Sequence, residues 1–150
     1  TEDEIQKRVA HALDMVGLSG KQSNMPSDLS GGMRKRAALA RLIVYRPKIL
    51  LYDEPTTGLD PITAQQINKL INATKKELNA TSIVVTHDIH SAMEVGDRLA
   101  FHHEGKIIHI APKEEFVKID DPLIKAFFEN AILTEDHLEP QHFKTPEQAK

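Results

Sequence analysis

The chain of 150 residues contains no cysteine. Disulfide bonds, zinc–thiolate sites and thiol nucleophiles are therefore excluded, and the composition fits a cytosolic protein. No stretch approaches the roughly 20 consecutive apolar residues that a membrane-spanning helix needs. The first residues do not form a charged and then apolar leader, so nothing in them indicates secretion.

A surplus of basic residues is also missing, because the net charge is −3. Proteins that bind nucleic acid usually carry a basic patch or stripe, so we predict no nucleic-acid partner. The one basic cluster, Arg34-Lys35-Arg36, is interpreted as a solvated helix face. Apolar residues make up 40% and charged residues 27%, which is ordinary for a soluble domain with a core of its own.

A phosphate-binding loop of the form Gly-x-x-x-x-Gly-Lys-Ser/Thr is absent as well. The nearest match is Gly17-Leu18-Ser19-Gly20-Lys21, whose glycines are three apart (20 − 17 = 3). The loop needs a spacing of five, and Gln22 stands where a hydroxyl should coordinate Mg²⁺. The segment also follows a predicted helix, whereas such loops follow strands, so we reject it.

Hydrophobic periodicity predicts strands and helices in alternation, which favours an α/β fold with a parallel sheet covered by helices. The two sheet strands read as buried on both faces, and a Glu104-Gly105 turn predicts a separate hairpin. The polar tail from Thr134 is expected to be loosely ordered. The predicted helices are 2–16, 32–45, 63–78, 91–95, 113–118 and 122–130, the sheet strands 49–52 and 82–86, and the hairpin strands 98–103 and 106–111.

Two carboxylates, Asp53 and Glu54, follow the first predicted strand directly. Ligands bind at the carboxyl edge of parallel strands in open α/β sheets. Asp53 is suited to hold Mg²⁺ that bridges phosphate oxygens, and Glu54 is suited to orient or deprotonate an attacking water. Alternatively, the pair only caps the next helix.

Ser30-Gly31-Gly32 precedes a predicted helix. The N–H groups and the positive dipole end of a helix N-terminus form an anion site, and glycine lets a phosphate approach closely. The alternative is an ordinary capped helix.

Two further residues carry a predicted role. His87 follows the second strand, where an imidazole can hydrogen-bond a terminal phosphate. Asp60 stands between Gly58 and Pro61, where it either caps the next helix or reaches across a subunit boundary.

These motifs in this order resemble the C-terminal part of the ATP-binding subunit of ABC transporters, over roughly residues 5 to 130. The resemblance identifies Leu29 to Met33 as the signature loop, Asp53 as the Walker B aspartate and Glu54 as the catalytic glutamate. It likewise identifies Asp60 as part of the D-loop and His87 as the switch histidine. It implies ATP and Mg²⁺ as cofactors and a head-to-tail dimer, in which Ser30, Gly31, Gly32, Met33 and Asp60 face the ATP of the opposing subunit.

Met33, where the family usually has Gln, and Asp60-Pro61-Ile62-Thr63 resemble the ATPases of lipid-trafficking systems of the mammalian-cell-entry and maintenance-of-lipid-asymmetry type. The resemblance implies transport of phospholipid or another hydrophobic substrate. It also implies transmembrane permease subunits, indirect contact with a mammalian-cell-entry-type lipid-binding protein, and a peripheral position on the cytoplasmic face of the cell membrane.

We therefore predict a P-loop NTPase-like fold that is incomplete, because the Walker A half is absent. Residues 1–48 would belong to the helical subdomain, 49–111 to half of the catalytic core, and 112–150 to C-terminal helices and a tail. The 150 residues alone are predicted to be inactive, since the family's adenine-stacking aromatic residue and Q-loop glutamine are not identifiable either. Apolar sheet surfaces that the missing half would cover are expected to be exposed.

Other interpretations remain open. The motifs also occur in ABC-type ATPases of DNA repair or translation, and the chain could be a non-catalytic binding module. His102 and His109 fall on one face of a hairpin with a two-residue turn, beside His103, which makes a metal site conceivable. Asp120-Asp121 reads as a helix start.

Overall fold

The computed structural model describes the backbone of residues 1–136 and the side chains of residues 1–129. The chain divides into two compact units, Thr1–Asp97 and Arg98–Lys150. The predicted division into residues 1–48, 49–111 and 112–150 stays a prediction. Among the described residues, every helix is too short or too polar to cross a membrane.

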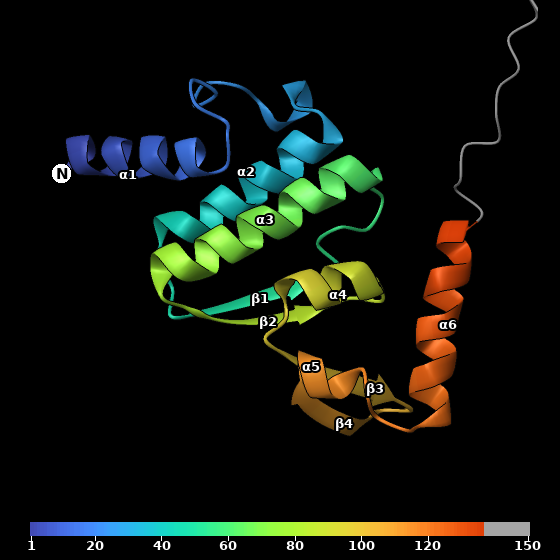
Figure 1. Cartoon of the computed structure of the whole chain (residues 1–150). Helices are drawn as coiled ribbons and strands as arrows, with labels where there is room; N and C mark the ends of the chain where they lie inside the picture. The colour runs from blue at the N-terminus through green and yellow to red at the C-terminus, as the bar shows by residue number, and fades with distance from the viewer. Residues whose placement is uncertain (137–150) are drawn as a thin grey trace, which may run out of the picture. The chain divides into compact units, whose positions relative to one another are not determined.

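The first unit is built around two parallel strands, β1 (Ile49–Asp53) and β2 (Thr81–Val85), paired from Ile49 with Thr81 to Asp53 with Val85. Helix α3 (Pro61–Leu78) connects them, and the residue that follows it, Asn79, takes a left-handed conformation that ends the helix. Figure 1 shows α2 running beside α3 over this pair of strands. The other helices of this unit are α1 (Glu2–Met15), the short 3-10 helix η1 (Pro26–Asp28), α2 (Gly31–Val44) and α4 (Ile89–Val95).

The core of this unit lies between the helices and one face of the sheet. Leu50 and Tyr52 of β1 point into it and are 2% and 9% exposed. They pack with apolar side chains from α1, α2 and α3, among them Val16, Ile43 and Ile71. Burial of this apolar face holds the strand end in place, which fixes the position of the carboxylates that follow it.

The sheet is half-buried, which corrects the prediction that both strands are buried on two faces. The alternate residues Ile49, Leu51, Ile83 and Val85 are 56–69% exposed. The reason is that the helices of this unit pack on the face carrying Leu50 and Tyr52. The expected exposure of apolar sheet surface is thus confirmed for these residues.

The second unit begins with an antiparallel hairpin of β3 (Arg98–His103) and β4 (Lys106–Pro112). Glu104 and Gly105 both have positive φ, as a two-residue hairpin turn requires. Helices α5 (Lys113–Phe116) and α6 (Pro122–Asp136) follow. Because α6 continues to Asp136, Thr134 belongs to a helix and not to the polar tail, and the rest of that predicted tail lies outside the described residues.

A β-bulge removes the basis of the predicted histidine site. Phe101 pairs with His109 and His102 with Ile107, so Ile108 is the extra residue of the bulge. The extra residue turns His109 to the face opposite to that of His102. His109 instead contacts Asp121 at 2.9 Å, and no cluster of three metal-ligating side chains exists among the described residues.

Asp121 confirms the predicted helix start. Its Oδ1 accepts hydrogen bonds from the N–H groups of Leu123 at 2.8 Å and Ile124 at 3.4 Å, in the first turn of α6. The same carboxylate holds His109, which joins β4 to α6.

Candidate functional site

The carboxyl edge of the sheet brings Glu54 and His87 together. The strand pairing continues one residue past β1, where the N–H of Glu54 donates to the carbonyl of Val85 at 2.9 Å. Glu54 has a φ of +46°, a left-handed conformation that is uncommon for a residue with a Cβ. Strained backbone of this kind clusters at functional sites, because the surrounding structure must enforce it. Here it turns the carboxylate toward the end of β2.

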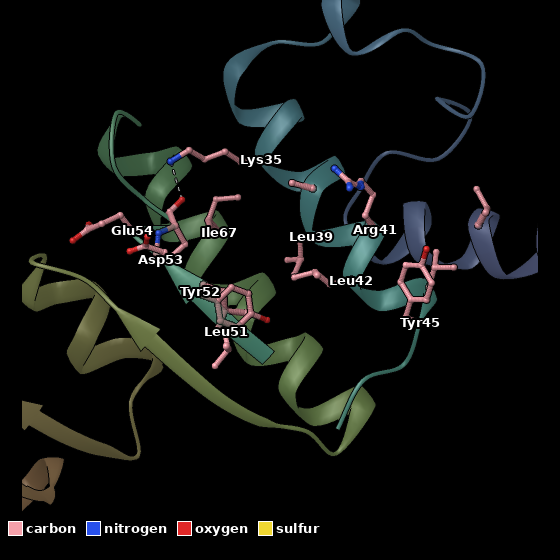
Figure 2. Close-up of a pocket in the computed structure, with 15 residues that line it drawn as sticks. Lys35, Leu39, Arg41, Leu42, Tyr45, Leu51, Tyr52, Asp53, Glu54 and Ile67 are labelled. Atoms are coloured by element: carbon pink, nitrogen blue, oxygen red, sulfur yellow. Dashed lines mark hydrogen bonds between the residues drawn. The ribbon is translucent and has the colours of Figure 1, made fainter. Parts of the chain in front are cut away.

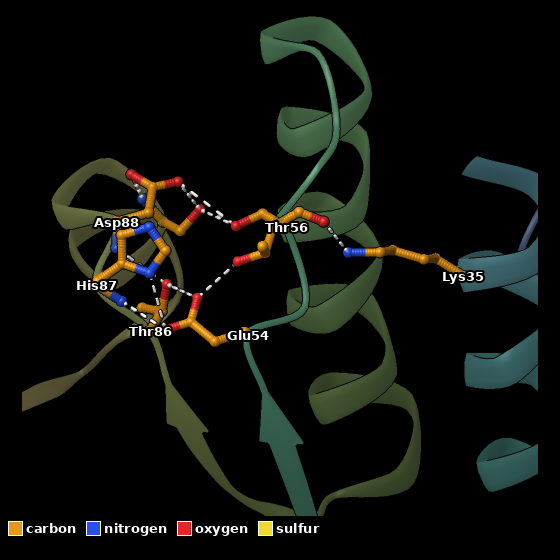
Figure 3. Close-up of polar contacts among 8 residues, drawn as sticks. Lys35, Glu54, Thr56, Thr86, His87 and Asp88 are labelled. Carbon is orange, nitrogen blue, oxygen red and sulfur yellow. Dashed lines mark hydrogen bonds and ion pairs between the residues drawn. The ribbon is translucent and has the colours of Figure 1, made fainter. Parts of the chain in front are cut away.

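Both carboxylate oxygens of Glu54 accept hydrogen bonds (Figure 3). Oε1 lies 2.9 Å from Nδ1 of His87 and 3.0 Å from the backbone nitrogen of the same residue. Oε2 accepts from the hydroxyl of Thr57 at 2.8 Å and from that of Thr86 at 3.5 Å. Glu54 is therefore held in one orientation from two sides.

The contact shifts the two pKa values in opposite directions. The hydrogen bond from His87 lowers the pKa of Glu54 below its ordinary value of 4.5, and Thr57 adds to this effect. The same bond raises the pKa of His87 above 6.5, because the carboxylate favours the imidazolium. Glu54 is thus ionised at neutral pH but engaged by His87. A carboxylate in this state must be released before it can accept a proton from water.

Asp53 is exposed at the end of β1, next to Glu54 (Figure 2). Its oxygen donors suit Mg²⁺, which proteins commonly hold through one or two carboxylates while substrate phosphates and water supply the remaining ligands. A single accessible carboxylate at a sheet edge fits that mode of binding.

A cavity of about 680 Å³ lies beside these carboxylates, between α2, β1 and α3 (Figure 2). Its lining is mostly apolar and includes Leu39, Leu42 and Leu51. The hydroxyl of Tyr52, which also lines the cavity, is buried without a hydrogen-bond partner, and burial raises the pKa of Tyr52 to about 12. The lining is therefore suited mainly to apolar groups, although the cations Lys35 and Arg41 also belong to it.

The signature loop forms the start of α2. Ser30 is the N-cap, and its Oγ accepts the N–H of Met33 at 3.3 Å. The side chain of Met33 packs against the core, so only its backbone is directed to the loop. In the described residues no hydrogen bond or ion pair joins Ser30, Gly31 or Gly32 to Glu54 or His87, so the structure forms two separate groups of predicted site residues.

The two glycines of the loop have different surroundings. A Cβ on Gly31 would meet no other atom within 4 Å, so the space beside it is open. A Cβ on Gly32 would lie 2.9 Å from Cγ2 of Thr63 in the first turn of α3, closer than packing allows. Gly32 therefore permits α2 and α3 to approach within this chain, whereas Gly31 leaves room for a ligand.

Asp60 caps α3, as one of its two predicted roles requires. Its Oδ1 accepts the N–H of Thr63 at 3.0 Å, and Pro61 occupies the first helical position. Hydrogen bonds from Thr63 lower the pKa of Asp60. Gly58 has a φ of +75°, which allows the turn between Glu54 and this cap. A contact of Asp60 across a subunit boundary stays a prediction.

The interpretation of the basic cluster as a solvated helix face holds only for the exposed Arg34, since Lys35 and Arg36 are half-buried. All three side chains donate to backbone carbonyls: Arg34 to Leu29, Arg36 to Val16 and Gly17, and Lys35 to Pro55 and Thr57. The carbonyls at the end of α1 and in the turn after β1 lack helix or sheet partners, and these cations satisfy them. A charge pattern along the chain does not reveal such acceptors.

A buried polar network behind the site was also missed. Ser91, 1% exposed, donates to Asp88 at 2.6 Å and lies 3.3 Å from the hydroxyl of Thr56. Asn68 donates to Ser91 at 2.9 Å and to Glu94 at 3.0 Å. The network joins the turn after β1 to the loop after β2. A polar Asn68 beside Ile67 and one turn before Ile71, in the apolar stripe of α3, was the signal in the sequence.

Comparison with known proteins finds relatives among transport ATP-binding proteins. The ABC transporter family model matches residues 1–57. The probable ribonucleotide transport ATP-binding protein of Mycobacterium leprae is 37% identical over 84% of this chain and 36% of its own length. The chloroplastic protein Trigalactosyldiacylglycerol 3 of Arabidopsis thaliana is 38% identical over 85% and 41%. A glutamine transport ATP-binding protein of Geobacillus stearothermophilus is 42% identical over 77% and 47%.

Solved structures show the same fold. The chain matches CbiO1 of Clostridium perfringens, part of the ABC transporter complex CbiONQ, with a TM-score of 0.72 and 35% identity over 93% of this chain and 52% of that one. It matches the dimeric bacterial ABC transporter cassette MJ0796 with a TM-score of 0.64 and 34% identity over 75% and 48%. The chain thus spans about half the length of these cassettes and less than half of the curated relatives. It has the ABC ATPase cassette fold, and its sequence is similar to part of the ATP-binding subunits of ABC transporters.

Proposed function

We propose that these residues supply the signature loop and the hydrolytic carboxylate of an ATP-hydrolysing subunit that drives an ABC transporter. The observation that carries the proposal is the Glu54–His87 contact at 2.9 Å, beside Asp53 at the carboxyl edge of the sheet. A base, a histidine and a potential Mg²⁺ ligand meet at the edge where α/β proteins bind nucleotides.

Each residue has a distinct task in this account. Glu54 orients the attacking water and accepts its proton once His87 has moved from the carboxylate to the terminal phosphate. The open space at Gly31 and the N–H groups of the first turn of α2 receive the phosphate held by an opposing subunit. Mg²⁺ on Asp53 would neutralise charge on the phosphate oxygens.

The proposal requires a Gly-Lys-Ser/Thr loop from residues other than these 150, on the same polypeptide or on another. Without that loop, the backbone N–H groups and the lysine that bind the phosphates are missing. A polypeptide of these residues alone is therefore proposed to be inactive. The working unit would be a head-to-tail dimer associated with transmembrane permease subunits at the cytoplasmic face of the membrane. The similar protein CbiO1 is part of a transporter complex, and the similar cassette MJ0796 forms a dimer, which supports this assembly.

For the substrate we propose a phospholipid or another hydrophobic molecule, delivered with a mammalian-cell-entry-type lipid-binding protein. Met33 and the segment Asp60-Pro61-Ile62-Thr63 support this choice, and one relative carries the name of a galactolipid. Other relatives are named for ribonucleotide and glutamine transport, and these substrates are the alternatives.

A complementation experiment tests the composite site. Glu54→Gln and Ser30→Arg are introduced separately into the ATPase that contains these residues together with a Gly-Lys-Ser/Thr loop. Each variant alone should hydrolyse Mg²⁺-ATP poorly, because both sites of its dimer are defective. In the mixed dimer one site combines an intact Glu54 with an intact Ser30, so mixing should restore part of the activity. Two inactive variants that stay inactive although they form mixed dimers would contradict the head-to-tail arrangement.

A further inference from the structure

Lys35 links the helix of the signature loop to the turn beside Glu54. It lies five residues after the N-cap Ser30, on the first turns of α2, and is partly buried. Its Nζ donates to the carbonyl of Pro55 at 3.0 Å and to that of Thr57 at 2.5 Å. Figure 3 draws one of these two bonds. One ammonium group therefore holds two carbonyls of the same turn, 20 and 22 residues further along the chain.

The acceptors of Lys35 are backbone atoms. In the described part of the chain no carboxylate forms an ion pair with it. A surface lysine gains little from one exposed partner, but an ammonium that satisfies two carbonyls fixes the turn that carries them. A displacement of the first turns of α2 would therefore also displace this turn.

The turn leads directly to the reacting carboxylate. The carbonyl of Thr57 accepts from Lys35, while the hydroxyl of Thr57 donates to Oε2 of Glu54 at 2.8 Å. Oε1 of Glu54 in turn holds His87. A continuous path of three contacts therefore runs from Lys35 through Thr57 and Glu54 to His87.

A second contact connects the same two elements. Gly32 packs against Thr63 so closely that a Cβ would lie 2.9 Å from Cγ2 of that residue. Thr63 is in turn bonded to Asp60 at the start of α3. The start of α2 is thus joined to both ends of the segment between Glu54 and Thr63, so a displacement of the signature loop acts on the whole segment.

We propose that Lys35 is a positioning residue that couples the signature loop to Glu54 and His87 of the same chain. Phosphate binding at Ser30 and Gly31 shifts the start of α2, and Lys35 transmits the shift to the turn that orients Glu54. The inference rests on the proposed function, since it gives the loop and the carboxylate their roles in one reaction. The inference adds a path within one subunit from the signature loop, which faces the ATP of the opposing subunit, to Glu54, which acts on the ATP of its own subunit.

The first test measures this path without any catalysis. The pKa of His87 is determined by NMR titration in the 150-residue chain, with the signal assigned through His87→Gln. Lys35→Met removes the ammonium and should return the pKa of His87 toward 6.5, because Glu54 loses its fixed orientation. Lys35→Arg, which keeps a charged donor, should preserve the raised value. Lys69→Met on the exposed side of α3 is the control and should change nothing.

A double-mutant cycle separates positioning from a general structural role. Thr57→Val removes the hydroxyl that reaches Glu54 but leaves the carbonyl that Lys35 binds. If Lys35 acts through Thr57, the effects of Lys35→Met and Thr57→Val on the pKa of His87 are not additive. Additive effects, or an unchanged pKa in Lys35→Met, would overturn the proposal. Should Lys35→Met fail to fold, Lys35→Gln takes its place in the same cycle.

The second test uses the ATPase that also carries the Gly-Lys-Ser/Thr loop. Lys35→Met should lower kcat by about tenfold and leave KM for ATP unchanged, because Lys35 positions Glu54 and is not proposed to contact ATP. A higher KM with an unchanged kcat would overturn the inference. If the unmodified ATPase hydrolyses no ATP, the proposed function fails, while the NMR titration still decides whether Lys35 controls the Glu54–His87 contact.

Discussion

At the scale of single residues, the site is defined by an ion pair formed under backbone strain. Glu54 adopts a φ of +46°, and its side chain is held by Thr57 and His87. Strain at this position is maintained because neighbouring contacts fix the carboxylate. Glu54 is thus held in one orientation, with His87 bound to its carboxylate.

The opposite pKa shifts predict how stability depends on pH. The lowered pKa of Glu54 contributes stability above 4.5, which is lost as the pH falls through the folded-state pKa. The raised pKa of His87 contributes stability below 6.5, which is lost as the pH rises through its folded-state pKa. The pair therefore stabilises the fold most between these two values. Urea denaturation of the 150-residue chain should show a larger destabilisation by His87→Gln at a pH of about 5.5 than at about 8.5.

The matched control is the same substitution in a Glu54→Gln background, where the carboxylate charge is gone. There the effect of His87→Gln should be alike at both pH values. An effect that depends on pH equally in both backgrounds would show that another group titrates.

At the scale of elements, the start of α2 serves packing and binding at adjacent positions. Gly32 lets α2 approach Thr63 of α3, and Gly31 faces open space. The sequence alone gives both glycines the same role in phosphate binding. The contact of α2 with α3, which is tertiary, separates them.

Alanine substitutions should distinguish the two glycines. Gly32→Ala should destabilise the fold by roughly 1–3 kcal/mol, because the new methyl group overpacks against Thr63. Gly31→Ala should change the free energy of unfolding by less than about 1 kcal/mol, since its backbone needs no glycine and the space is open. Urea denaturation measures both. Thr63→Ser, which removes Cγ2, should restore the stability of Gly32→Ala; a Gly32→Ala chain as stable as the unmodified one would refute the packing role.

Periodicity and turn signals predict every α-helix and strand of the described chain, because local hydrophobic patterns reflect which face is buried. The short 3-10 helix η1 was not predicted. The prediction that Glu54 and His87 each follow a strand of a parallel sheet is also confirmed, and the structure adds that they are in contact. Contacts between distant segments are not encoded in such patterns. The bulge at Ile108, the carbonyl acceptors of Lys35 and the link from Ser91 to Thr56 all depend on tertiary placement.

At the scale of the whole molecule, the described chain leaves apolar surface uncovered beside the proposed nucleotide site. The sheet face with Leu51 and Val85 is exposed, and an apolar cavity lies beside Asp53 and Glu54. The chain spans about half of the solved cassettes that it matches. The central claim is therefore that Glu54 acts in ATP hydrolysis only when a Gly-Lys-Ser/Thr loop is supplied.

The most direct test is the rate of Mg²⁺-ATP hydrolysis, measured for the ATPase with that loop, for its Glu54→Gln and Glu77→Gln variants, and for the 150-residue chain alone. We predict that Glu54→Gln lowers kcat by at least about 100-fold, in the range found when a general base is removed. Glu77→Gln, an exposed acid on α3, should leave the rate unchanged, and the 150-residue chain should be inactive. Hydrolysis by the 150-residue chain at the rate of the loop-containing ATPase, or full activity of Glu54→Gln, would contradict the account.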